Sequence, residues 1–254
     1  MLDALSGKHP SVPDVLVLCY HAISPAWSAA LSARPEAFRT QVRALARRGY
    51  AGATFAQAVL YPPARRTVAF TFDDAFASVA ELAAPILAEH GFPATVFAVT
   101  DFAAQGRRLE WDGIEHWVGG PHDRELLSLD WEGLRALAGR GWEIGSHTCS
   151  HPRLTRLGDE RLASELSTSR VTCEQAIGTC TSLAYPYGDV DARVVAAARA
   201  AGYRAAAALP KRWPAAPLDP LEYPRAGIWQ GEGLLRLAIK SSPSALRARS
   251  ALGR

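Results

Sequence analysis

The stretch Val68-Ala69-Phe70-Thr71-Phe72-Asp73-Asp74 decides the fold, because an apolar run ends there in two adjacent carboxylates. A second short apolar run, 142–145, leads into His147-Thr148-Cys149-Ser150-His151, with two histidines four residues apart. Apolar runs rich in β-branched residues are typical of strands buried on both faces of a parallel sheet. One carboxylate and two imidazoles make a three-ligand set for a divalent metal that leaves positions open for water and substrate. The pattern favours metal-assisted hydrolysis, with the spare carboxylate as a general base.

Strand-like and helix-like segments alternate along most of the chain. Strands are expected at 15–20, 67–72, 94–99, 142–145, 182–184, 203–208 and 223–228, and helices at 36–48, 78–89, 131–140, 159–177, 191–201 and 233–239. Such alternation implies right-handed βαβ units and a parallel sheet. About seven strands predict a closed or nearly closed α/β barrel, and 254 residues suit one domain of this class.

The domain is expected to span residues 15–240, between an N-terminal extension at 1–14 and a basic tail at 241–254. The segment at about 102–130 breaks the alternation with two tryptophans, two histidines and a Gly-Gly-Pro turn. We interpret it as a loop insertion over one end of the barrel.

Bulk composition excludes several classes of protein. The net charge is only +3 and no basic stripe carries interleaved aromatics, so nucleic acid is not an expected partner. No segment is long and apolar enough to be read as a transmembrane span. Residues 1–14 lack the basic start and apolar core of a secretion signal. If Met1 is the true start we expect a cytoplasmic protein, whereas a longer precursor would leave an extracytoplasmic location open. The four cysteines form no CxxC pair, and Cys173 is expected to be a buried thiol.

Polar motifs follow the predicted strands at their carboxyl ends, where barrel active sites form. These motifs are Tyr20-His21, Asp73-Asp74, His147 with His151, Tyr185-Pro186-Tyr187-Gly188, and Arg225 in or after the last strand. Each has a structural alternative. On its own, the Asp pair favours a turn or helix-capping role over a catalytic one. The two histidines alone fit one buried and one exposed side chain as well as they fit a metal site.

The remaining motifs have both functional and structural interpretations. Histidine is the natural general acid near neutral pH, so His21 is a candidate acid or else a core histidine. Arg225 is a candidate to hold a catalytic carboxylate ionised, or else a surface ion pair. The Tyr-Pro-Tyr-Gly turn can aim a backbone N–H at an oxyanion, or simply turn the chain. The indoles of Trp111, Trp117, Trp213 and Trp229 can stack on sugars or pack internally.

Together, Thr71-Phe72-Asp73-Asp74, His147-x-x-x-His151 and Tyr185-Pro186-Tyr187-Gly188 resemble the motifs of the polysaccharide deacetylases, carbohydrate esterase family 4, in order over about residues 15–230. The resemblance implies a distorted (β/α)7 TIM-like barrel. It implies a divalent metal, most often Zn²⁺ with Co²⁺ or Ni²⁺ as alternatives, held by Asp74, His147 and His151. It implies Asp73 as the base and the Tyr187 N–H as an oxyanion donor. The substrate contacts that we expect are Tyr185, Pro186, Tyr187 and Trp229. The implied substrate is an acetylated sugar or glycan of the N-acetylglucosamine type.

Two family features are missing. The arginine that opens the third motif and tethers the base is replaced by Ala184, and no histidine follows His151 to supply the usual late general acid. The chain is similar to a rearranged branch, the deacetylases of poly-N-acetylglucosamine export, in which a Tyr-His after the first strand supplies the acid and a later arginine tethers the base. His21 and Arg225 fit those roles. A metal-dependent amidohydrolase of non-sugar C–N bonds and an inactive glycan-binding relative are the alternatives.

Overall fold

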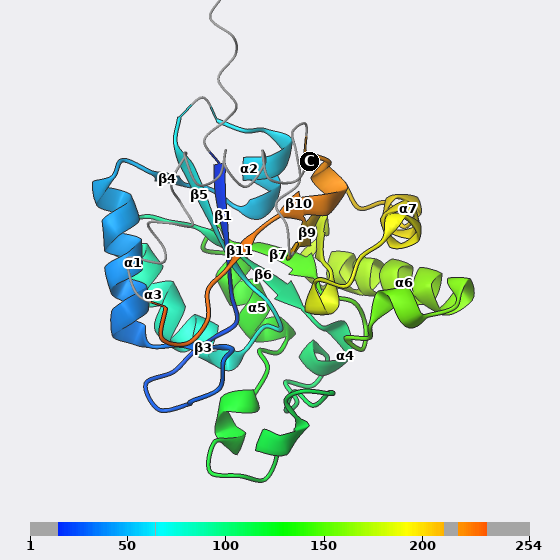
Figure 1. Ribbon diagram of the computed structural model, residues 1–254, viewed down its shortest axis with the longest axis horizontal. Coiled ribbons are helices and arrows are strands. Elements are labelled where there is room, and N and C mark those ends of the chain that lie inside the picture. The colour runs from blue at the N-terminus through cyan, green and yellow to red at the C-terminus, as the bar shows by residue number, and fades with distance from the viewer. Residues whose placement is uncertain (1–14, 64, 211–217, 233–254) are drawn as a thin grey trace, which may run out of the picture.

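The computed structural model describes residues 15–63, 65–210 and 218–232. Its central sheet is entirely parallel, in the order β10-β9-β8-β7-β6-β5-β1-β11, with β4 also paired to β5 (Figure 1). The strands are β1 (Val15–Tyr20), β4 (Ala51–Gly52), β5 (Thr67–Phe72), β6 (Ala94–Ala98), β7 (Glu143–Ser146), β8 (Ser182–Ala184), β9 (Ala205–Ala208), β10 (Tyr223–Pro224) and β11 (Ala226–Gly227). A separate pair joins β2 (Ala22–Ile23) to β3 (Ser32–Ala33).

The last strand closes the barrel by changing partners in its middle. β10 pairs with β9, whereas β11 pairs with β1 at the opposite edge of the sheet. Arg225 lies between them, and its N–H donates to the carbonyl of Ala208 at 3.0 Å. Among the described residues, β1, β5 to β9 and the interrupted β10–β11 give seven strand positions. The predicted single-domain, nearly closed α/β barrel is confirmed.

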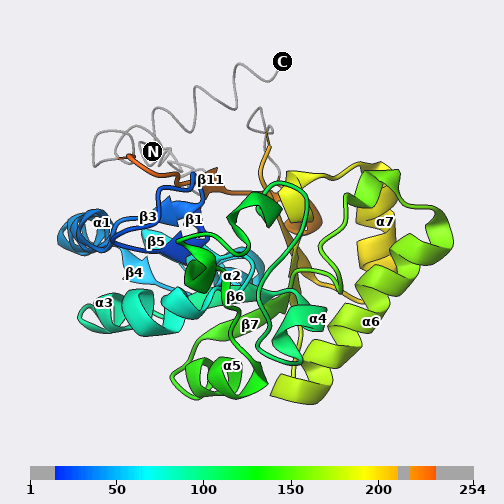
Figure 2. The same cartoon turned by 90° about the horizontal axis from the view of Figure 1, so that it is seen from below.

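Helices surround the strands (Figures 1 and 2). They are α1 (Pro35–Arg47), α2 (Phe55–Leu60), α3 (Ala84–Ala88), α4 (Thr100–Ala103), α5 (Trp131–Ala138), α6 (Asp159–Ile177) and α7 (Ala192–Ala200). Short 3₁₀ turns lie at Glu115–Trp117, Asp123–Leu126, Leu154–Arg156, Pro186–Gly188 and Pro220–Glu222. Within the described residues, no helix combines the length and hydrophobicity that crossing a lipid bilayer requires.

Several elements differ from the sequence-based expectation. The helix expected at 78–89 begins as a π-helical turn, Val79–Ala83, and continues as α3. Pro85 lacks an N–H and crowds the preceding turn, which a wider turn accommodates. The strand expected at 223–228 is broken at Arg225. Helix α2 was not expected, although Thr54 and Gln57 form a reciprocal capping box at its start. The helix expected at 233–239 and both terminal segments lie outside the described residues.

Strand alternation divides the buried residues between the barrel interior and the layer beneath the helices. The interior is filled by small side chains such as Ala69, Ala184, Ala205 and Ala207, together with Phe97. Helix α2 adds Phe55 to this cluster, and the Phe55 and Phe97 rings lie 5.7 Å apart. Because the interior is tightly filled, open space for a ligand is restricted to the ends of the strands.

Substituting Gly145 tests this packing. A Cβ on Gly145 would lie 2.6 Å from Ser182 Oγ and 2.7 Å from the Phe97 ring. Gly145→Ala is therefore expected to lower the free energy of unfolding by about 1–3 kcal/mol through overpacking, measured by urea denaturation. Gly139→Ala is the control, because a Cβ there makes only ordinary contacts, at 3.5 and 3.7 Å, and the backbone at Gly139 is already helical. Equal stability of the two variants would contradict a filled interior.

Candidate active site

Three buried side chains converge at the carboxyl ends of β5 and β7. The Asp74 Oδ1 atom lies 3.4 Å from Nε2 of His147 and 3.5 Å from Nε2 of His151. The potential ligand atoms of these three residues all lie within 4.8 Å of one another. Asp74 faces the two histidines, whereas Asp73 faces Arg225, as neighbouring positions at a strand end allow.

The donor atoms of this group fit a divalent cation. Within the described residues, Asp74 Oδ1 is buried and has no hydrogen-bond partner, a costly arrangement that a bound cation relieves. Burial raises the pKa of Asp74, and the neighbouring Asp73 charge raises it further. His147 Nδ1 lies 2.8 Å from the carbonyl of Ala184. When Nδ1–H donates there, the Nε2 lone pair faces Asp74, which is the tautomer that a metal ligand needs.

The loops that carry these side chains adopt left-handed backbone conformations. All described non-glycine residues with positive φ lie in these loops or in the turn after β8: Asp74 (71°), Ala75 (58°), Thr148 (70°), His151 (60°) and Tyr187 (60°). Such conformations are strained for residues with a Cβ and cluster at functional sites. They turn the chain sharply at the strand ends, so that Asp74 and His151 can face the same point.

Asp73 is held by a buried, two-pronged ion pair. Arg225 Nη1 donates to Oδ1 at 2.6 Å and Arg225 Nη2 to Oδ2 at 2.8 Å, while Nη1 also donates to Thr71 Oγ1 at 2.9 Å. Burial raises the pKa of Asp73, but the Arg225 charge and the nearby His147 outweigh it and hold that pKa well below its usual range. Asp73 is therefore ionised and fixed in orientation, although Ala184 stands where the family motif has its arginine.

His21 lies beside Asp73 at the end of β1. Burial lowers the pKa of His21 to about 4, although the Asp73 charge opposes this, so the ring is neutral near pH 7. Its ring stacks on Trp229 at 5.6 Å with an interplanar angle of 26°. The structure thus brings His21 into the same charge network as Asp73, Arg225 and His147.

Aromatic rings, rather than a hydrogen bond to Nδ1, orient the imidazole of His151. Its Nδ1 atom is buried and has no partner among the described residues. Instead Trp111, from the 102–130 insertion, stacks on the imidazole at 4.1 Å and 25°, and the Tyr187 ring meets it at 4.6 Å. Arg153 lies 4.1 Å over the Tyr187 ring, whose hydroxyl donates to the carbonyl of Asp112 at 3.3 Å. The insertion therefore buttresses one side of the site.

The other residues predicted to contact substrate are placed differently. Tyr185 is fully buried in a hydrophobic cluster and donates its hydroxyl to the carbonyl of Leu221 at 2.7 Å, and Pro186 is also buried. By contrast, Tyr187 and Trp229 are 36% and 37% exposed. Only these last two side chains of the predicted substrate-binding set have substantial surface available to a ligand.

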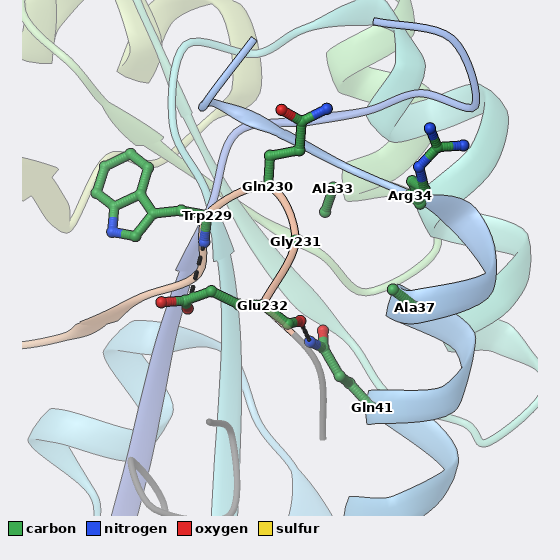
Figure 3. Close-up of a pocket in the computed structure, with 8 residues that line it drawn as sticks. All are labelled: Ala33, Arg34, Ala37, Gln41, Trp229, Gln230, Gly231 and Glu232. Carbon is green, nitrogen blue, oxygen red and sulfur yellow. Dashed lines mark hydrogen bonds between the residues drawn. The ribbon is translucent and has the colours of Figure 1, made fainter. Parts of the chain in front are cut away.

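A pocket of about 380 Å³ lies between α1 and the loop after β11. Trp229 lies at one edge of it, and Arg34 and Gln41 lie across from it (Figure 3). Because Trp229 stacks on His21, this pocket adjoins the site.

Sequence reasoning missed two residues of the site. Trp111 comes from an irregular insertion, and no periodicity connects it to His151. Cys19 lies 3.5 Å from Asp73 Oδ2 through its Sγ. Its spacing of two from His21 was a usable signal, because alternate residues of a strand share a face.

Removing one partner of the buried Arg225–Asp73 ion pair is expected to destabilise the folded protein. Arg225→Met leaves the Asp73 charge buried without its partner and should lower the unfolding free energy by about 3–5 kcal/mol. Adding Asp73→Asn to that variant should recover a large part of the loss, because the uncompensated charge disappears. Guanidinium denaturation of both single variants and the double variant measures the coupling. Strictly additive effects would contradict it.

Loss of the Trp111 ring is expected to weaken metal binding. Trp111→Ala removes the stacking that orients His151 and should reduce zinc affinity by about 10–100-fold, as losing an orienting partner does. Competition with a chromophoric chelator measures this without any substrate. Trp111→Phe preserves an aromatic face and should stay close to the unsubstituted protein. Equal affinities for all three proteins would remove Trp111 from this role.

Comparisons with known proteins identify the family of the chain. The profile of the polysaccharide deacetylase family matches residues 61–206. The chain is 27% identical over 194 residues to the putative polysaccharide deacetylase YxkH of Bacillus subtilis (strain 168), covering 74% of this chain and 62% of that relative's length.

Solved structures show the same fold. The Streptococcus pyogenes deacetylase PplD, in complex with acetate, superposes with a TM-score of 0.75 at 20% identity, over 90% of this chain and 98% of that one. IcaB from Ammonifex degensii superposes with a TM-score of 0.68 at 21% identity, over 94% and 96%. The family match spans more than half of the sequence and contains Asp73, Asp74, His147, His151 and Tyr187. The chain therefore belongs to the polysaccharide deacetylase family.

Proposed function

We propose that this chain is a metal-dependent deacetylase that hydrolyses the N-acetyl group of an N-acetylglucosamine-type sugar or glycan. The observation that carries the proposal is the placement of two functions side by side. Asp74, His147 and His151 converge as a metal-binding group, and Asp73, next in the chain, is held ionised by Arg225. A metal site with an adjacent fixed base is what amide hydrolysis requires.

Zinc is the proposed cation, since two imidazoles and one carboxylate suit it and three protein ligands leave room for catalysis. When bound, it would supply Lewis acidity towards the acetyl carbonyl and make water more acidic. Co²⁺ and Ni²⁺ are the alternatives, because imidazole ligands bind them as well.

The protein's own groups then move the protons. Asp73 accepts a proton from the attacking water, and Arg225 keeps its carboxylate in one orientation while it does so. His21 delivers a proton to the departing amine nitrogen. Because its resting ring is neutral, His21 must first take up a proton, and the one that Asp73 removes from the attacking water balances the one delivered to the amine. The Tyr187 backbone N–H, placed by the turn at Pro186–Gly188, is the proposed donor to the oxyanion.

The exposed aromatic surface supports a sugar substrate. Trp229 has a half-exposed indole beside His21, and indoles stack on the apolar faces of sugar rings. The 380 Å³ pocket next to it has room for a neighbouring sugar unit of a glycan. The relative YxkH is itself a putative polysaccharide deacetylase, which points the same way.

Arg225 also bears on the inactive alternative. Loss of the motif arginine at Ala184 alone would leave the base without a tether. The Arg225–Asp73 ion pair supplies one from another strand. This compensation favours an active enzyme over a binding-only relative.

Acetate release tests the function directly. We expect release from free N-acetylglucosamine, its oligomers, nucleotide-linked N-acetylglucosamine or an O-acetyl ester, in the presence of zinc and not after chelation. The best substrate of this panel identifies the class. Turnover of ureides or cyclic imides but of no sugar would favour the non-sugar amidohydrolase, and bound zinc without any turnover would favour the inactive relative.

The proposed acid is tested by substitution. His21→Ala should reduce kcat on the order of a hundredfold or more, while binding of the first equivalent of zinc stays unchanged because His21 is not a ligand in the group Asp74, His147 and His151. His90→Ala is the matched control, since His90 precedes β6 at the opposite end of the strands. Full activity of His21→Ala would exclude His21 from proton transfer.

A further inference from the structure

A second group of potential metal ligands lies beside the first and includes a side chain that the proposed mechanism does not use. The thiol of Cys19, the imidazole of His21 and the carboxylate of Asp73 have ligand atoms within 4.8 Å of one another, and all three residues are buried. Cys19 and His21 are two residues apart at the end of β1 and so face the same side of the strand.

The donor atoms of this group are weakly engaged. Among residues 15–63, 65–210 and 218–232, the Cys19 thiol makes only long hydrogen bonds, at 3.5 Å to Asp73 Oδ2 and 3.9 Å to the carbonyl of Tyr20. His21 Nδ1 is buried and has no hydrogen-bond partner among the described residues. A buried imidazole nitrogen without a partner is costly, and a thiol, an imidazole and a carboxylate together form a ligand set that zinc accepts.

We propose that Cys19, His21 and Asp73 form a second, weaker metal site, and that zinc or another thiophilic divalent cation bound there inhibits the enzyme. Binding at this site follows from the three side chains alone. Its inhibitory effect rests on the proposed function, because it requires Asp73 and His21 to act as base and acid.

Charge sets the order in which the two sites fill. Arg225 donates to both oxygens of Asp73, so a full positive charge adjoins the Cys19 group. Within the part of the chain that the structure describes, no guanidinium is bonded to Asp74, and its buried Oδ1 atom has no hydrogen-bond partner. Repulsion from Arg225 therefore makes the Cys19 site the weaker of the two. It fills only when metal exceeds one equivalent.

Binding at the second site releases one proton. The Cys19 S–H bond breaks, sulfur bonds to the cation, and the proton leaves to solvent. His21 binds as the neutral ring that burial favours, and Asp73 contributes a lone pair beside its bonds to Arg225. With both residues occupied as ligands, Asp73 cannot accept a proton from water and His21 cannot deliver one to the amine.

Cobalt spectroscopy tests the site without substrate. The full chain, freed of metal, is titrated with Co²⁺, and the thiolate-to-cobalt charge-transfer absorption in the near ultraviolet is recorded. We expect the first equivalent to add little of this absorption, because Asp74, His147 and His151 carry no sulfur. The second equivalent should add it in the unsubstituted protein and not in Cys19→Ser. Cys149→Ser is the matched control and should keep the band, because Cys149 belongs to neither group of potential ligands, although it lies between His147 and His151 in the chain.

Zinc inhibition tests the consequence. Acetate release should rise to one equivalent of zinc and fall as zinc increases further. Cys19→Ser should raise the zinc concentration for half-inhibition on the order of tenfold or more, whereas Cys149→Ser should not. Each variant is compared with its own activity at one equivalent, so differences in basal rate do not matter.

The outcomes separate the two proposals. A Cys19-dependent cobalt band without deacetylase activity would leave the second site standing and overturn the proposed function. Deacetylase activity with no Cys19-dependent band would overturn the second site. Inhibition by excess zinc that is equal in Cys19→Ser and the unsubstituted protein would also overturn it, and Cys19→Ala checks that a residual serine ligand is not the cause.

Discussion

The buried ion pair between Arg225 and Asp73 joins the closure of the barrel to the charge of the site. Before Arg225 the backbone pairs with β9 as strand β10, and after it the backbone pairs with β1 as strand β11. The Arg225 side chain reaches Asp73 at the end of β5. Two buried charges of this kind are tolerable only when they are paired, and here both carboxylate oxygens of Asp73 accept from Arg225. The same residue therefore fixes the last strand, satisfies a desolvated carboxylate and keeps that carboxylate ionised.

The other constraint is backbone strain at the mouth of the barrel. Glycine would adopt the left-handed conformations at Asp74, His151 and Tyr187 without cost, but glycine has no carboxylate, imidazole or phenol. The chain keeps the functional side chains and accepts the strained backbone. Tight packing below compensates for that strain, since the strands beneath these loops are buried on both faces.

Much of this arrangement can be read from the sequence, because it depends on local rules. Apolar runs locate the strands, and parallel strands bring their carboxyl ends together, so Asp73, Asp74, His147 and His151 had to meet. Other features depend on contacts between distant segments. The break at Arg225 follows from a change of pairing partner, and Trp111 reaches His151 from an irregular insertion. No periodicity encodes either contact. Helix α2 has a local signal in its capping box, but it is only six residues long and was overlooked.

The separation of Asp73 and Arg225 along the chain has a consequence for biosynthesis. The two residues are 152 positions apart, so their contact is among the most non-local in the molecule. Ribosomes deliver the N-terminal strands first. A nascent chain therefore acquires Asp74, His147 and His151 before it acquires the guanidinium that orients the neighbouring carboxylate. A product terminated before Arg225 retains all three of these side chains, but it lacks both the tether and the strand β11 that pairs with β1.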